Sequence, residues 1–200
     1  MIIGITGGTG CGKTTLLDVI RQNGGVVLDC DAIYHRLLKT DHTLLSAIEN
    51  RFPGTVENGQ LQRKKLGGVV FHDKEALQDL NRITHSAVKN EVVKELAKNH
   101  KLVAIDAIGL FESGLNELCN ITVAVTAPTE DRIKRLMARD GITEDYARSR
   151  IEAQPSNEEF RLRCDHVLEN NLSADAFVAK CLAFLTQLGI IEENEKGESL

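Results

Sequence analysis

The chain has few of the features that are typical of exported proteins, of proteins stabilised by a structural metal, or of membrane-spanning proteins. Its 200 residues include five cysteines, an odd number, and no two of them form a C-x-x-C pair. A disulfide framework or a zinc site is therefore not expected, and a reducing cytosol fits these thiols best. No apolar run approaches the length of a membrane span, and no basic leader precedes the first apolar stretch. We expect a soluble cytoplasmic protein with no membrane partner.

Positive charge is also scarce. Lys and Arg number 24 against 29 Asp and Glu, which leaves a formal net charge of -5. A broad electrostatic attraction to nucleic acid is therefore disfavoured, and no nucleic-acid partner is expected. With 42% hydrophobic residues and only three prolines, the composition is that of an ordinary globular protein. The length fits one domain with a sizeable core.

Short apolar, β-branched runs alternate with helical patterns along the chain. Runs that are apolar on both faces suit the strands of a parallel sheet that helices cover on each side. The runs are Ile2–Thr6, Val26–Asp29, Leu102–Asp106, Ile121–Val125 and, more weakly, His166–Leu168. A helix is expected over Leu16–Asn23, which completes a βαβ unit with the first two runs.

Two long connections separate these strands. The first has no strand of comparable quality, and its pattern predicts helices over Ala32–Lys39, Thr43–Arg51 and Glu75–Asn99. So long an insertion is suited to a substrate-binding lobe. The second covers residues 129–163, where the capping-box spacing of Ser156 to Glu159 restarts a helix. The polar tail at 192–200 is expected to fray.

A glycine-rich segment follows the first predicted strand directly. Residues 7–14 (GGTGCGKT) fit G-x-x-x-x-G-K-[ST] between a predicted strand and a predicted helix. Successive backbone N–H groups in such a loop surround phosphate oxygens, and the helix N-terminus adds partial positive charge. Lys13 can reach the β and γ phosphates, and the Thr14 hydroxyl can ligate Mg²⁺. The chain is therefore expected to bind a nucleoside triphosphate.

Three classes of triphosphate-using protein remain open: a switch GTPase, an ATPase that drives mechanical work, and a small-molecule kinase. Asp106 and Gly109 match the D-x-x-G of GTPases, but the sequence has no guanine-reading N-K-x-D motif. Asp106 also ends an apolar strand, as a Walker B carboxylate does, where it can hold Mg²⁺ directly or through water. The alternative for Asp106 is a carboxylate that caps a turn.

Two further features favour the kinase. Asp29 and Asp31 stand at the carboxyl end of the second strand, where open α/β sheets bind ligands, and in extended backbone both face one side. One of them can orient an acceptor hydroxyl and take its proton; the alternative for either is a helix N-cap. Arg132, Arg135 and Arg139 share one helical face, which suits a lid over phosphates, although a solvated face is the alternative.

In combination these motifs resemble the dephospho-coenzyme A kinase family over about residues 2–190. The matching segments, in the family's order, are GITGGTGCGKT, VLDCDAIYHRLL, LNRITH (residues 80–85), VAIDAIGLFE, RLMARDG, RIEAQPSNEE and CDHVLENN. The resemblance implies an α/β fold, a three-layer P-loop kinase core with a five-stranded parallel sheet. It also implies one domain over residues 1–191, with a helical substrate-binding insertion at about 32–101 and a helical lid at about 129–163.

The resemblance further implies a reaction and its residues. ATP with Mg²⁺ would phosphorylate the ribose 3′-hydroxyl of dephospho-CoA, the last step of coenzyme A biosynthesis, in a monomer or weak homo-oligomer. The implied catalytic residues are Asp31 as base, Lys13, and Arg139 in the lid. The implied ATP-binding residues are Gly8, Gly10, Cys11, Gly12, Lys13, Thr14, Thr15 and Asn171. The implied acceptor-binding residues are Asp31, His85, Phe111, Glu112 and Arg139, and the metal ligands are Thr14 and Asp106.

The sequence departs from the family pattern at a few positions. Ser86 stands where proline is usual, which predicts an altered helix entry, and Ile108-Gly109 replaces Pro-Leu, which predicts a more flexible backbone. Cys11 and Cys30 replace small residues; a thiol in a phosphate loop invites sensitivity to thiol reagents, but an inert thiol is expected. Two alternatives stay open: a kinase of another small acceptor (nucleoside, nucleotide or sugar), and a nucleotide-binding regulatory module without turnover.

Overall fold

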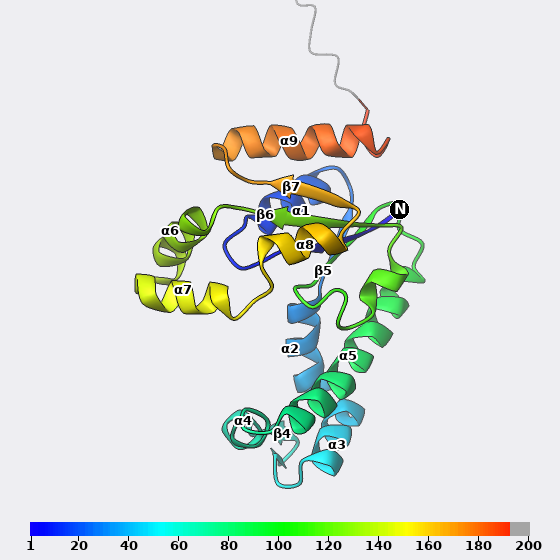
Figure 1. Cartoon of the computed structure of the whole chain (residues 1–200). Helices are drawn as coiled ribbons and strands as arrows, with labels where there is room; N and C mark the ends of the chain where they lie inside the picture. Colours follow the sequence, from blue (N-terminus) through cyan, green and yellow to red (C-terminus); the bar gives the residue numbers. More distant parts are fainter. Residues whose placement is uncertain (193–200) are drawn as a thin grey trace, which may run out of the picture.

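The computed structural model describes residues 1–192. Figure 1 shows a sheet with helices on both faces and a helical arm that extends away from it. The expectation of a frayed tail falls almost wholly on residues 193–200, which lie outside the described part. No helix in the described part is long and apolar enough to cross a membrane.

The sheet has five parallel strands in the order β2-β5-β1-β6-β7. The strands are β1 (Ile2–Thr6), β2 (Val26–Asp29), β5 (Val103–Asp106), β6 (Ile121–Thr126) and β7 (His166–Glu169). All five predicted strands are confirmed to within one residue at either end, because short apolar, β-branched runs are typical of the strands of a parallel sheet. The central strand β1 leads directly into the glycine-rich loop (Figure 1).

Helices α1 (Lys13–Gln22) and α9 (Ala174–Gln187) pack together over one face of the sheet. Their buried side chains form one core with those of β1 and β6. The other face is covered by α8 (Asn157–Arg163) and by the segment after β5 that contains the short 3₁₀ helix η1 (Leu115–Leu118) (Figure 1). Sheet and helices thus form the three layers that the sequence predicts.

The long connection between β2 and β5 forms the arm in Figure 1. Its helices are α2 (Cys30–Thr40), α3 (His42–Arg51), α4 (Arg63–Val70) and α5 (Lys74–Leu96). Helix α4 was not predicted, and neither were the two-residue strands β3 (Val56–Glu57) and β4 (Gln60–Leu61). Helix α5 runs without a break through Ser86, so the expected altered helix entry is wrong: no helix begins there.

The second helical excursion contains α6 (Thr129–Asp140), α7 (Glu144–Glu152) and α8. Helix α8 begins at the predicted capping box, in which the Ser156 hydroxyl accepts from the Glu159 N–H and the Glu159 carboxylate accepts from the Ser156 N–H. Helices α6 and α7 pack on each other and form a separate small core around Leu136 and Ala147. This pair stands beside the carboxyl end of the sheet (Figure 1).

Asp29 has a local structural role. Its carboxylate accepts a 2.9 Å hydrogen bond from the Ala32 N–H and caps the N-terminus of α2. The backbone is already helical from Cys30, so the rule that residues two apart in a strand face the same side does not apply to Asp29 and Asp31. The expectation that both carboxylates face one side of extended backbone is therefore wrong.

This cap gives a stability prediction. Asp29→Ala should lower the free energy of unfolding by about 1 kcal/mol, because an N–H of the first turn loses its acceptor. Asp29→Asn should stay near wild type, because Asn is an equally good N-cap. Urea unfolding of the three proteins tests this, and an equal loss in both variants would assign the effect to the charge of Asp29 instead of the cap.

Candidate active site

The glycine-rich loop between β1 and α1 has the backbone shape of an anion site. Gly7 and Gly12 have φ values of 139° and 94°, in the left-handed region that favours glycine. A Cβ atom at Gly12 would lie 2.2 Å from Nδ2 of Asn170, and one at Gly7 would lie 2.1 Å from the Val125 carbonyl oxygen. The first N–H groups of α1 have no intrahelical acceptor and add the positive end of a helix to the loop.

The loop borders a hollow of about 250 Å³. Its lining includes Gly8, Gly10, Gly12, Lys13 and Thr14, all predicted to bind ATP, together with Asp106, Ile108, Arg135 and Arg139. Lys13 Nζ donates to the Gly7 carbonyl at 2.8 Å, so the ammonium lies inside the curve of its own loop. Thr15 and Cys11 are not among the lining residues.

The two unusual cysteines are buried. Cys11 is 1% exposed and packs in the core beneath the loop, and burial raises the pKa of its thiol. Burial also raises the pKa of the Cys30 thiol to about 12, and the nearby carboxylates of Asp106, Asp29 and Asp31 act in the same direction. A thiol that is seldom ionised is a poor nucleophile, which fits the expected inert role.

Asp106 is the carboxyl group of the site whose pKa burial raises. Its Oδ1 is buried and has no hydrogen-bond partner among the described residues. Burial raises the pKa of this carboxyl from 3.8 to about 6; Lys13 opposes the shift, and Asp29 and Asp31 add to it. A carboxylate that lies near Lys13 and has a buried, unpartnered oxygen fits a cation ligand better than the turn cap considered as its alternative.

Parallel pairing brings the carboxylates to one edge of the sheet. Asp29 at the end of β2 is in register with Asp106 at the end of β5, which in turn is in register with Ile5 of β1. Asp31 lies in the first turn of α2 and lines a second cavity of about 240 Å³. The sheet edge therefore carries three carboxylates: that of Asp29, which caps α2, that of Asp106, which has a buried oxygen, and that of Asp31, which lines the cavity.

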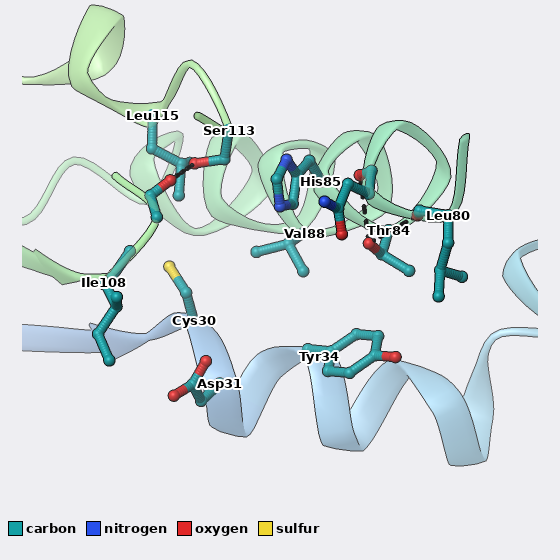
Figure 2. A pocket seen from close by; sticks show the side chains of 13 residues that line it. Cys30, Asp31, Tyr34, Leu80, Thr84, His85, Val88, Ile108, Ser113 and Leu115 are labelled. Carbon is teal, nitrogen blue, oxygen red and sulfur yellow. Dashed lines mark hydrogen bonds between the residues drawn. The ribbon is translucent and has the colours of Figure 1, made fainter. Parts of the chain in front are cut away.

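This second cavity lies between α2 and α5. Figure 2 shows Asp31 and Tyr34 on α2 opposite Leu80, Thr84 and His85 on α5, with Ile108 and Ser113 at one end. His85 thus lies with Asp31, as the acceptor-site prediction requires. Tyr34, Leu80 and Thr84 were missed, although Tyr34 is one helical turn after Asp31 and Leu80 and Thr84 precede His85 on the same helix.

Phe111 and Glu112 lie beside this cavity and not in it. Glu112 lines an adjoining hollow of about 450 Å³ that shares Asn81, His85 and Ser113 with the cavity. The Arg163 guanidinium lies 4.4 Å from the centre of the Phe111 ring and pairs with the Glu112 carboxylate at 2.5 Å. In this structure both residues therefore anchor the segment after β5 to α8.

The three arginines of α6 do not share one environment. Arg132 is 2% exposed, Arg135 is half-buried, and Arg139 is exposed and pairs with Asp140 at 2.7 and 3.0 Å. Arg135 and Arg139 line the hollow at the phosphate loop, whereas Arg132 packs behind the loop and donates to the Thr9 carbonyl. The three arginines share the face of α6 that meets the loop, as predicted, but their spacing could not show that Arg132 is buried while Arg135 and Arg139 line the hollow.

The segment after β7 also meets the loop, through Asn170. Asn170 is 6% exposed and donates from Nδ2 to the Cys11 carbonyl at 3.0 Å. Asn171, the predicted ATP-binding residue, is exposed. A role for Asn171 stays a prediction.

Comparison with known proteins gives the family. A family profile described as dephospho-CoA kinase matches residues 1–175. The dephospho-CoA kinase of Corynebacterium diphtheriae is 35% identical over 87% of this chain and 90% of its own length. The chain belongs to the dephospho-CoA kinase family. The dephospho-CoA kinase of Thermus thermophilus is 36% identical, over 94% of this chain and 92% of its own length.

Solved structures agree with this family assignment. A crystal structure of a Thermus thermophilus protein, 36% identical, superposes with a TM-score of 0.78 over 94% of this chain and 97% of that one. A shikimate kinase from Acinetobacter baumannii, 20% identical, has a TM-score of 0.53 over 94% of this chain and 93% of that one, which shows the shared fold alone. The predicted P-loop kinase fold and the family resemblance are both confirmed.

The raised pKa of Asp106 gives a pH-dependent prediction. The folded state binds a proton at Asp106 more tightly than the unfolded state does, so ionising this carboxyl costs stability as the pH rises from about 4 to about 6. Asp106→Asn removes that cost and should stabilise the nucleotide-free protein by about 1–3 kcal/mol at pH 7. At pH 4 the gain should largely vanish.

Urea unfolding at pH 4, 5, 6 and 7, without nucleotide or magnesium, measures this difference. A gain that is independent of pH, or a loss at pH 7, would contradict the assignment of a desolvated carboxylate.

Proposed function

We propose that this chain transfers the γ-phosphoryl group of ATP to the ribose 3′-hydroxyl of dephospho-CoA, giving coenzyme A and ADP. The observation that carries the proposal is the junction of two hollows at the carboxyl edge of the sheet. Ile108 lines both the hollow of the phosphate loop and the cavity that contains Asp31. A phosphate donor in one and an alcohol in the other would meet at that residue.

In the donor hollow, the loop N–H groups and the Lys13 ammonium oppose the charge on the β and γ phosphates. Thr14 and Asp106 are the proposed Mg²⁺ ligands. The unpartnered Oδ1 of Asp106 fits this role. A single carboxylate is sufficient for such a role, since Mg²⁺ uses one or two carboxylates together with substrate oxygens and water. When bound, Mg²⁺ would neutralise charge on the triphosphate.

In the acceptor cavity, Asp31 is the proposed base. Its carboxylate is exposed at the cavity, whereas the Asp29 carboxylate is engaged as the α2 cap. Phosphoryl transfer has a loose transition state, so aligning the hydroxyl matters at least as much as removing its proton. His85, Phe111 and Glu112 remain proposed acceptor residues, with His85 the one that shares the cavity with Asp31.

Residues 129–163 are the proposed lid and residues 32–101 the proposed acceptor lobe of one domain, residues 1–191. Arg139 lines the donor hollow and pairs with Asp140, which also accepts a 2.7 Å bond from Arg150. Arg139 can therefore leave Asp140 for a phosphate while Arg150 keeps the carboxylate paired. Five free thiols support a reducing, cytoplasmic location, and a monomer or weak homo-oligomer remains the expectation.

Asp31→Asn tests the acceptor half of this proposal. Asn keeps the shape of Asp but cannot accept a proton at neutral pH, so transfer to dephospho-CoA should slow by about 100-fold or more. ATP affinity and melting temperature should stay near wild type. Single-turnover transfer at saturating ATP and acceptor is the measurement.

Asp29→Asn is the matched control, because it removes the same charge from the same sheet edge and preserves the cap. It should retain most of the rate. If Asp31→Asn transfers at nearly the wild-type rate while Asp29→Asn is inert, the two aspartates have been assigned the wrong way round.

A further inference from the structure

Three side chains from distant segments donate hydrogen bonds to the carbonyl groups of the phosphate loop. Arg132 Nε donates to the Thr9 carbonyl at 2.8 Å, Arg135 Nη1 to the Gly10 carbonyl at 3.2 Å, and Asn170 Nδ2 to the Cys11 carbonyl at 3.0 Å. Two of these donors come from α6 and the third from the segment after β7. Three consecutive peptide groups of the loop therefore each have an external partner.

The orientation of these peptides follows from their partners. A trans peptide is planar, and its C=O and N–H point in opposite directions. Fixing the Thr9 and Cys11 carbonyls toward the outer side chains therefore turns the N–H groups of Gly10 and Gly12 away from those side chains and toward the hollow. The glycine conformations at Gly10 (φ 76°) and Gly12 (φ 94°) allow this arrangement but do not enforce it, because glycine is equally free to adopt others.

Gln154 completes the contact behind the loop. Its Oε1 accepts from the Thr9 N–H at 2.7 Å and from Arg132 Nη2 at 3.4 Å. Both backbone groups of Thr9 are thus bound, one by Gln154 and the other by Arg132. The Arg132 guanidinium also fills the space beside Gly8, where a Cβ atom would lie 2.2 Å from its Nη2.

The position of Gln154 in the chain shows which segment makes this contact with the loop. It lies in the connection between α7 and α8, within the proposed lid, yet it does not line the hollow at the loop. Arg132, on α6 of the same segment, is buried and does not line that hollow either. The proposed lid thus contacts the phosphate loop in two places. Arg135 does so at the hollow, and Arg132 and Gln154 do so away from it.

We propose that Gln154 is a positioning residue that, through Thr9 and Arg132, holds the phosphate loop in the conformation that binds triphosphate. It acts on nucleotide affinity without touching nucleotide. The inference rests on the proposed function only in naming ATP as the nucleotide. Its mechanism is preorganisation: the loop N–H groups are oriented before the anion arrives, so less free energy is lost in ordering them on binding.

The test compares two substitutions at one site. Gln154→Met has a similar length and no acceptor, so the ATP dissociation constant, measured by calorimetry with Mg²⁺, should rise about tenfold, the scale of one lost hydrogen bond. Gln154→Glu keeps an acceptor oxygen for Thr9 and Arg132 and should stay within about twofold of wild type. The KM for dephospho-CoA should not change in either variant.

Melting temperatures and a second variant separate positioning from general destabilisation. Gln154→Ser takes the acceptor out of reach of the Thr9 N–H, because its hydroxyl is attached to Cβ, and should weaken ATP binding as Gln154→Met does, including when Gln154→Met itself does not fold. Wild-type affinity in the Met and Ser variants would overturn the inference and leave the proposed function intact. Equal weakening in Met and Glu variants would also overturn it, because packing would then explain the effect. A wild-type protein that does not bind ATP would overturn both.

Discussion

The site depends on one stretch of backbone, the turn from Gly7 to Lys13 that leaves the central strand and enters α1. Its N–H groups can serve an anion only if the carbonyls of the same peptides are satisfied elsewhere, since an unpaired buried polar group is costly. Here the carbonyls of Thr9, Gly10 and Cys11 all have side-chain partners from distant segments. The loop is thus a product of tertiary structure as much as of its glycines.

The parallel sheet supplies the second constraint. Because β2, β5 and β1 run in one direction and in register, the residues that follow them meet at one edge, and Asp106 stands between the phosphate loop and the α2 N-terminus. The cost is a desolvated carboxylate whose pKa is raised to about 6. A site that binds a cation and a polyanion is expected to sacrifice stability in this way, since the groups that it needs are unpaired until the ligands bind.

Much of the fold could be predicted from the sequence because its strongest signals are local. Strands that are buried on both faces, the loop motif and the capping box at Ser156 each depend on a few adjacent residues. Several of the errors concern tertiary context. Helical spacing grouped Arg132 with Arg139 but could not show that Arg132 is buried behind the loop. Nothing near Gln154 in the sequence points to Thr9, because the two residues meet only when α7 and α8 are in place.

The position of the transferred phosphate tests the central claim most directly. The purified chain is incubated with Mg²⁺, ATP and dephospho-CoA, and the product is examined by phosphorus–proton correlation NMR together with ADP release. We expect one new phosphomonoester, coupled to the ribose H3′ proton and formed in equal amount to ADP. A phosphate at any other position, or ADP released without a phosphorylated acceptor, would contradict the alignment of the 3′-hydroxyl by Asp31 at the junction of the two hollows.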